Sequence, residues 1–215
     1  MLTVAAGVLV AGGGGGVLVH ALIGTALVAA GTNALNQLFE RDVDARMERT
    51  RRRPLPSGRL TVAAAAAFAW AAGGMGILYL AVSVNLLAAA LAAATLGSYA
   101  FLYTPLKRRT SLATLIGAVP GALPIVGGWT AAGGPLGLRA WVLFAILFLW
   151  QLPHFLALAW IYREDYRRAG LRMLTVADGD GRATFRHAAL YAAALIPVSL
   201  APFVLELAGP LYFAG

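Results

Sequence analysis

The sequence predicts an all-α protein, a bundle of helices that crosses a membrane several times. Hydrophobic residues make up 60% of the 215 residues, and they fall in blocks close to the roughly 20 residues that a helix needs to cross a bilayer. These blocks are rich in Ala, Leu and Val and lack the alternation of barrel strands, and only helices and closed barrels span lipid. Charged residues, only 12% of the chain, gather between the blocks.

The expected elements form one transmembrane domain, residues 1–215, with about seven helices. Met1–Ala11 is a partial first helix, about 16 Å long at about 1.5 Å per residue, and the glycine run after it is a turn. Six full spans follow: Val17–Leu38, Thr61–Val82, Asn85–Leu106, Ser111–Ala132, Leu138–Tyr162 and Phe185–Leu207.

The basic residues predict the orientation of these spans. Of seventeen Lys and Arg, all except Arg139 lie in the segments after the first, third and fifth full spans. Those three segments emerge on one face, which the positive-inside rule places in the cytoplasm. We therefore expect a multi-pass protein of the inner membrane whose net charge of +8 reflects topology rather than a nucleic-acid partner.

Eight of the nine acidic residues share that face, only Glu206 lying elsewhere. The positive-inside rule gives acids no comparable bias, so a metal site or paired charges are indicated; alternatively, only these loops have room for polar residues. Cysteine is absent, which excludes disulfides, thioether-linked haem and iron–sulfur clusters. The N-terminus has no basic region typical of a signal peptide.

The first polar cluster continues the helix Val17–Leu38. Residues four apart advance by about 40° around a helix, so Asn36, Glu40 and Asp44 form one stripe. Three oxygen-bearing side chains at a membrane surface suit Mg²⁺, which commonly bridges to phosphate. The guanidinium groups that follow could clamp a diphosphate; they belong to Arg49, Arg51, Arg52 and Arg53. The alternative is a solvated loop of ion pairs. Asn36 argues against it, because a polar side chain inside a membrane span is costly unless it has a function.

The second polar cluster lies in WQLPHFLALAWIYREDY. Gln151 and His154 belong to the span Leu138–Tyr162, and Asp165 follows it three turns after His154, so both are expected to face the bundle interior. The alternative for His154 is a hydrogen bond between helices. A third patch contains Tyr103, Lys107, Arg108 and Arg109, which either contact phosphate or anchor a helix end at anionic lipid.

These motifs together resemble those of a known superfamily. The pattern N-x-x-x-(D/E)-x-x-x-D followed by M-x-R-T-x-x-R-P-L resembles the first motif of the UbiA-type intramembrane prenyltransferases. The tracts WQLPHFLALAWIYREDYRRAGLRML and YTPLKRRT are similar to those of its protohaem IX farnesyltransferase branch. The residues that carry the first motif are Asn36, Glu40, Asp44, Met47, Arg49, Thr50, Arg53, Pro54 and Leu55.

The resemblance implies transfer of the farnesyl group of farnesyl diphosphate to a vinyl group of haem b, giving haem O. Haem-modifying and oxidase-assembly proteins are then the expected downstream partners, and His154 either contacts the haem or handles the proton of the attacking water. The implied Mg²⁺ ligands are Asn36, Glu40, Asp44 and Asp165, and the implied diphosphate ligands are Arg49, Arg53, Lys107 and Arg108.

The superfamily pattern has nine helices around a central cavity that opens laterally to lipid. Against it we expect a chain truncated at both ends, with a partial first helix and the last helices missing. Three alternative functions stay open: a prenyltransferase for a quinone-type aromatic, a transporter, and an inactive fragment that binds haem or an assembly partner. A transporter would need polar groups near the midplane between inverted repeats, and the sequence shows neither.

Overall fold

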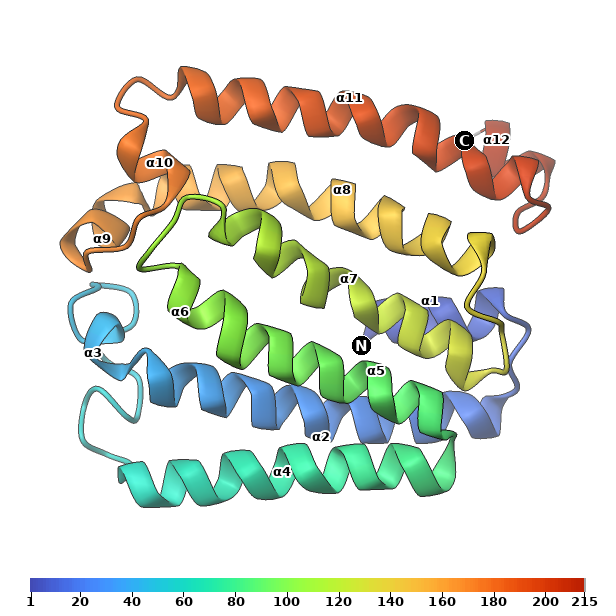
Figure 1. Ribbon diagram of the computed structural model, residues 1–215, viewed down its shortest axis with the longest axis horizontal. Coiled ribbons are helices and arrows are strands. Elements are labelled where there is room, and N and C mark those ends of the chain that lie inside the picture. Colours follow the sequence, from blue (N-terminus) through green and yellow to red (C-terminus); the bar gives the residue numbers. More distant parts are fainter. Residues whose placement is uncertain (215) are drawn as a thin grey trace.

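The computed structural model describes residues 1–214, and it is helical throughout its regular part (Figure 1). Six helices are long and apolar enough to cross a membrane. They correspond to the six predicted spans within three residues at each end, and the partial first helix is present as α1. The long elements are α1 (Leu2–Val10), α2 (Gly15–Phe39), α4 (Val62–Ser83), α5 (Leu86–Gly97), α7 (Ala113–Ala131), α8 (Leu138–Ile161) and α11 (Arg182–Val204).

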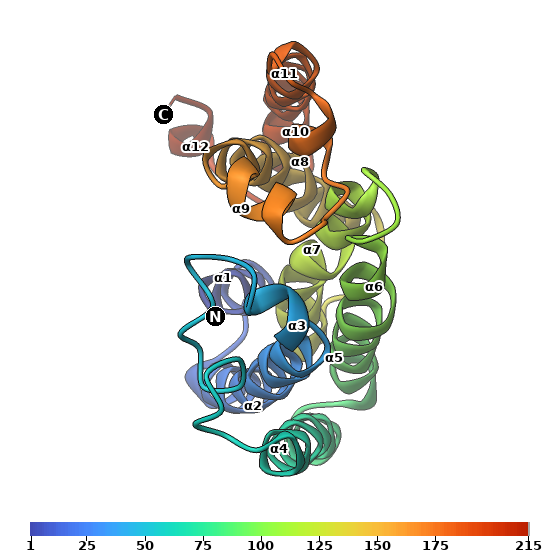
Figure 2. The ribbon, with the colours of Figure 1, turned by 90° about the vertical axis from the view of Figure 1, so that its left-hand side faces the viewer.

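Shorter elements cluster at one end of the bundle or extend the spans. A π-helical segment, η1 (Ser98–Tyr103), joins α5 to α6 (Thr104–Leu106) and completes the third span. The others are α3 (Arg41–Asp44), α9 (Arg163–Arg168), α10 (Leu174–Ala177) and α12 (Pro210–Ala214). The loop of α3, the loop after α6 and the loop of α9 and α10 lie at the end onto which Figure 2 looks, so the three charged loops share one face as the sequence predicts.

Local signals explain where the helices begin. The hydroxyl of Thr61 accepts a hydrogen bond from the N–H of Ala64, and the side chain of Asn85 accepts one from the N–H of Ala88. Such N-caps satisfy backbone donors that the first turn leaves unpaired. The Asn85 amide also donates to the carbonyl of Thr130 at 2.9 Å, which ties α5 to the end of α7.

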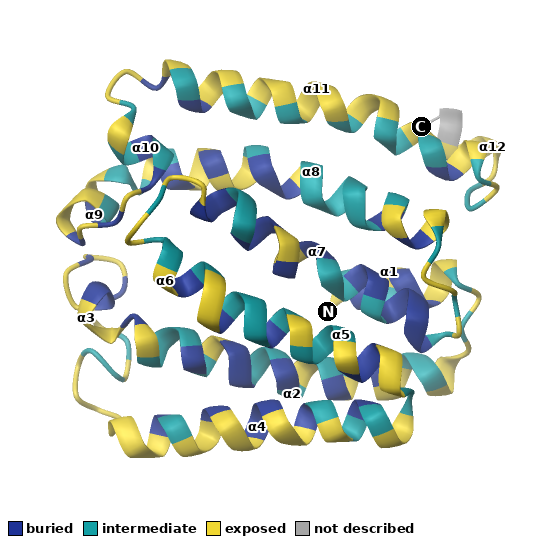
Figure 3. Ribbon diagram, viewed as in Figure 1, coloured by how far each residue is buried: buried dark blue, intermediate teal, exposed yellow. Residues whose placement is uncertain are grey.

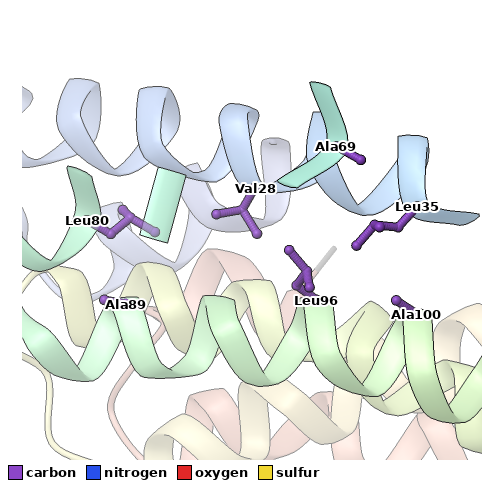
Figure 4. Packing of buried hydrophobic residues seen from close by; sticks show 7 residues of the cluster. All are labelled: Val28, Leu35, Ala69, Leu80, Ala89, Leu96 and Ala100. Atoms are coloured by element: carbon purple, nitrogen blue, oxygen red, sulfur yellow. The ribbon is translucent and has the colours of Figure 1, made fainter. Parts of the chain in front are cut away.

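The helices pack as two groups that meet at α7. On one side α2, α4 and α5 share a core (Figure 4), and α1 packs against α7; on the other, α11 packs against α8. Buried and exposed positions alternate along the helices (Figure 3). Many of the exposed residues are large and apolar. In a bilayer such residues contact lipid. The core shown in Figure 4 consists of Val28, Leu35, Ala69, Leu80, Ala89, Leu96 and Ala100.

Glycines allow α2 and α4 to approach closely. A Cβ atom added at Gly31 would lie 2.5 Å from the backbone nitrogen of Gly73, and one at Gly76 would lie 2.7 Å from the backbone nitrogen of Val28. Backbone atoms cannot swing away as a side chain can. Small residues at these positions are therefore a condition for this helix pair, as is common in membranes.

We expect Gly31→Ala to lower the free energy of unfolding by about 1–3 kcal/mol, and with it the thermal stability, because the new methyl group forces α2 and α4 apart. The matched control is Gly74→Ala, where an added Cβ meets nothing within 4 Å and helix propensity favours alanine. The measurement is the temperature at which the detergent-purified chain loses its monodisperse peak. Equal effects at the two positions would contradict the close-packing explanation.

Candidate active site

The first motif does not continue α2 without interruption. Helix α2 ends at Phe39, and Glu40 adopts φ −100° and ψ 8° before α3 begins at Arg41. The prediction of one unbroken helix through Asp44 is therefore wrong at Glu40, although the N–H of Asp44 still donates to the Glu40 carbonyl at 2.7 Å. The bend lets the following loop fold back onto the end of the bundle.

Glu40 is the centre of a buried polar network. Lys107 Nζ lies 2.9 Å from Glu40 Oε1 and 3.0 Å from Oε2, and it also lies 4.5 Å from the centroid of the Tyr103 ring. Asn36 Nδ2 donates to Glu40 Oε2 at 2.9 Å and to the hydroxyl of Thr104 at 3.3 Å. With its amide nitrogen occupied in this way, Asn36 has its carbonyl oxygen left to offer to a cation.

Asp44 is paired with a different cation. Arg53 Nη1 lies 3.1 Å from Asp44 Oδ1 and 2.9 Å from Oδ2, and the hydroxyl of Thr50 donates to the Asp44 carbonyl at 2.9 Å. Both contacts come from the loop that folds back after α3. Glu40 and Asp44 are thus close in the chain, but each pairs with a different basic side chain, Lys107 and Arg53 respectively. The two carboxylates do not share one cation.

Asp165 joins the third charged loop to the first. Its carboxylate accepts hydrogen bonds from the backbone N–H groups of Glu48 (3.2 Å) and Arg49 (3.4 Å) and pairs with Arg168. The second loop is joined by the N–H of Arg172, which donates to the Lys107 carbonyl at 2.9 Å. The tertiary structure therefore brings all three predicted patches to one site.

Burial and hydrogen bonding act in opposite directions on the pKa of Asp165. Burial raises this pKa, but the backbone N–H groups of Glu48 and Arg49, together with Arg168, lower it by more, so the net pKa lies below its ordinary value. A depressed pKa means that the carboxylate stabilises the fold above the pKa of the unfolded chain. This contribution is lost as the pH falls through the folded pKa.

We therefore expect Asp165→Asn to expose the loop of residues 45–58 to protease at neutral pH, where the wild-type chain resists. The difference should vanish in acid, below the depressed pKa, since both chains then lack the carboxylate. Limited proteolysis at a series of pH values measures this with an acid-active protease. The control is Glu164→Gln, which removes an exposed pair with Arg167 that is expected to contribute little.

The remaining predicted diphosphate ligands lie at the same end. The guanidinium of Arg49 lies 4.9 Å from the centroid of the Tyr162 ring. Arg108 is exposed and lines a cavity of about 370 Å³ whose wall also includes Glu40 and Thr104. Thr104 is a site residue that the sequence reasoning missed; its signal was its position three residues before Lys107, on the same helix face.

His154 is less buried than its neighbours Gln151 and Leu152. It is exposed on α8, and its ring stacks on Trp150 with centroids 5.8 Å apart at an interplanar angle of 15°. Gln151 takes an inward position, donating to the Ala118 carbonyl at 2.8 Å. The interior-facing role of His154 stays a prediction, since the two side chains differ by only about 60° around the helix.

The donor types suit a hard cation, but no metal site is assembled. Within residues 1–214, no three of His, Asp or Glu lie close enough to hold a metal ion. The three carboxylates are nonetheless almost fully buried, with exposed fractions of 6% for Glu40, 1% for Asp44 and 7% for Asp165. Buried anions need a cation, and here Lys107, Arg53 and Arg168 supply it.

An apolar cavity lies inside the bundle. It has a volume of about 180 Å³ and lies between α1, α2, α4, α5 and α7. Asn33 and Tyr99 contribute polar atoms, and most of the remaining lining is aliphatic. Charged loops beside an apolar interior define an intramembrane enzyme whose substrate has a charged head and an apolar tail.

Comparison with known proteins agrees with this description. The chain belongs to the UbiA prenyltransferase family, whose model matches residues 1–215. It is 56% identical to a protoheme IX farnesyltransferase of Solibacter usitatus over 198 residues, 92% of this chain and 68% of the relative. The corresponding enzyme of Koribacter versatilis is 50% identical, over 91% of this chain and 63% of the relative. That of Myxococcus xanthus is 46% identical, over 100% and 74%.

Solved structures show the same fold. The apo structure of a UbiA homologue from Aeropyrum pernix matches with a TM-score of 0.85 at 21% identity, covering 99% of this chain and 80% of the homologue. A homologue from Archaeoglobus fulgidus, solved with GPP and Mg²⁺ bound, matches with a TM-score of 0.76 at 18% identity, covering 99% and 78%. The chain thus spans about two thirds to three quarters of the three farnesyltransferases, and about four fifths of these two structures.

Proposed function

We propose that this chain transfers the farnesyl group of farnesyl diphosphate to a vinyl group of haem b, giving haem O. The observation that carries the prenyl-transfer half is the meeting of three buried carboxylates and their cations over an apolar interior. The acceptor rests on the relatives, named protoheme IX farnesyltransferase at 46–56% identity over most of the chain. A quinone-type acceptor has no comparable support.

The cations of the site bind the leaving group. Arg53 and Lys107 are held by Asp44 and Glu40, and Arg49 and Arg108 lie beside them without an acidic partner in the described part of the chain. A diphosphate would draw these four side chains to its oxygens and stabilise the charge that develops as the allylic C–O bond breaks. The electron pair of that bond leaves with the diphosphate.

The carboxylates released by Arg53 and Lys107 fit a magnesium ion. The oxygens of Asn36, Glu40, Asp44 and Asp165 would hold Mg²⁺, which when bound neutralises the diphosphate further. Their burial keeps them dehydrated and close to the apolar cavity. The ion pairs with Arg53, Lys107 and Arg168 balance the buried negative charge of these carboxylates.

The acceptor half needs a protected apolar space. The terminal vinyl carbon of haem b attacks the farnesyl cation, forming the new C–C bond and moving the positive charge to the adjacent carbon. Water then adds there and loses a proton, which leaves the hydroxyl group of haem O. His154, stacked on Trp150, presents aromatic faces to a porphyrin, and its imidazole can accept that proton.

The setting of the reaction follows from the charge distribution. We place the chain in the inner membrane with its charged end in the cytoplasm, because sixteen of seventeen basic residues lie at that end. Proteins that modify haem O or insert it into oxidases are the downstream partners that this product implies.

The test is a product analysis. Membranes that contain this chain receive haem b, farnesyl diphosphate and Mg²⁺, and extracted pigments are resolved by mass; the Solibacter usitatus relative provides the positive control. A haem O peak supports the proposal. Prenylation of an added quinone precursor with no haem O would overturn it and leave the family assignment intact.

A further inference from the structure

Two adjoining cavities lie at the charged end, and no residue of the proposed metal or diphosphate set lines them. Arg109 lines one of them and also the cavity that contains Glu40 and Arg108. The leucine cavity, about 150 Å³, lies between α7, α8, α10 and α11. The arginine cavity, about 410 Å³, is lined by Arg109, Thr110 and Arg172 among others. Ser111 lines both, so one elongated molecule could occupy the two together. The leucines are Leu112, Leu115, Leu152, Leu156 and Leu174.

The arginine cavity offers unbalanced positive charge. The hydrogen bond from the Arg172 N–H to the Lys107 carbonyl, 2.9 Å, holds the second and third charged loops together and brings Arg109 and Arg172 to one cavity. Neither guanidinium has an acidic partner in the part of the chain that the structure describes, and no Asp or Glu lines this cavity. The site is complementary to an anion such as a phosphate.

Thr114, which lines the leucine cavity, has a buried hydroxyl group without a partner. Thr114 is only 7% exposed, and its Oγ1 makes no hydrogen bond to any described residue. His187 lines the same cavity, with Nδ1 2.7 Å from the Ala183 carbonyl. A carbonyl only accepts, so Nδ1 carries the proton and Nε2 is the atom left for a ligand. A buried hydroxyl such as that of Thr114 usually has a partner, which a bound molecule would supply.

We propose that the two cavities bind one anionic phospholipid. Its phosphate lies against Arg109 and Arg172, an ester carbonyl accepts the hydrogen bond of Thr114, and an acyl chain enters among the leucines. The site lies where a headgroup is found, because basic residues beside a transmembrane helix attract anionic lipid at the cytoplasmic surface. The lining of the leucine cavity is mostly aliphatic, which suits the part of an acyl chain nearest the headgroup.

The test is native mass spectrometry of the detergent-purified chain with phosphatidylglycerol or with phosphatidylcholine of the same acyl chains. We expect one retained phosphatidylglycerol and at least about tenfold less retention of phosphatidylcholine, as the loss of charge-assisted hydrogen bonds implies. The double variant Arg109→Gln/Arg172→Gln should lose this preference. The matched control, Arg46→Gln/Arg52→Gln, removes two exposed arginines of the same end that line neither cavity.

A second variant keeps the proposal falsifiable if the arginine variant does not fold. Thr114→Val removes the unpartnered hydroxyl at nearly constant volume, so stability in lipid-free detergent should not fall, whereas the stabilisation by phosphatidylglycerol should shrink several-fold. Equal retention of the two lipids, or no change in either variant, overturns the proposal. A retained mass that corresponds to an isoprenoid diphosphate or haem also overturns it. None of these readouts depends on prenyl transfer.

Discussion

Asp44→Asn is expected to lower the rate of haem O formation by about 100-fold or more, while the chain still inserts and folds. The asparagine retains the shape of the side chain but not its charge, so it can neither hold Arg53 in place nor offer a carboxylate to a cation. Removing one electrostatic contact to a transition state commonly costs about 10²–10³ in rate. Asp44 is only 1% exposed, so bulk water cannot replace the interaction that its charge makes.

The rate is measured as haem O formed per folded chain in membranes, with folding assessed by the monodisperse fraction after extraction. Asp42→Asn is the matched control: it removes the same charge two residues away, from a side chain that is 66% exposed and lies 3.4 Å from Arg41. We expect it to retain nearly full activity. Equal losses in the two variants would show that the loop needs negative charge in general and would remove the specific role of Asp44.

Lys107→Met is expected to cause the largest combined loss, of both stability and activity. Its ammonium group is the cation of Glu40, and both side chains are largely buried, with exposed fractions of 14% and 8%. Removal of one partner of a buried pair leaves an uncompensated charge and commonly costs about 3–5 kcal/mol. Activity should fall as well, because the same ammonium group is proposed to bind the diphosphate.

A double variant separates these two roles. Glu40→Gln/Lys107→Met removes both charges, so most of the stability should return, since replacing a buried pair by neutral groups is often close to neutral. Activity should stay lost, because both a diphosphate ligand and a metal ligand are absent. Thermal stability and haem O formation are measured on the same membranes. If activity recovered together with stability, Lys107 would have only a structural role.

Some properties of this chain could be predicted from its sequence because they depend on neighbouring residues alone. The length of each apolar block predicts a span, and all six spans are confirmed within three residues at each end. The distribution of Arg and Lys predicts that three loops share a face, and the structure places these loops at one end. The motif residues predict a prenyltransferase of the UbiA type, and the family match confirms it.

Only the tertiary structure shows which charges meet. Glu40 and Lys107 are 67 residues apart and Asp165 is 117 residues from Glu48, so their contacts depend on how whole helices pack. The contact of Gln151 with the Ala118 carbonyl, 33 residues away, has the same origin. The type of a residue and its spacing in the sequence determine what chemistry its side chain can perform. Its partner and its burial depend on long-range packing, which cannot be predicted from neighbouring residues.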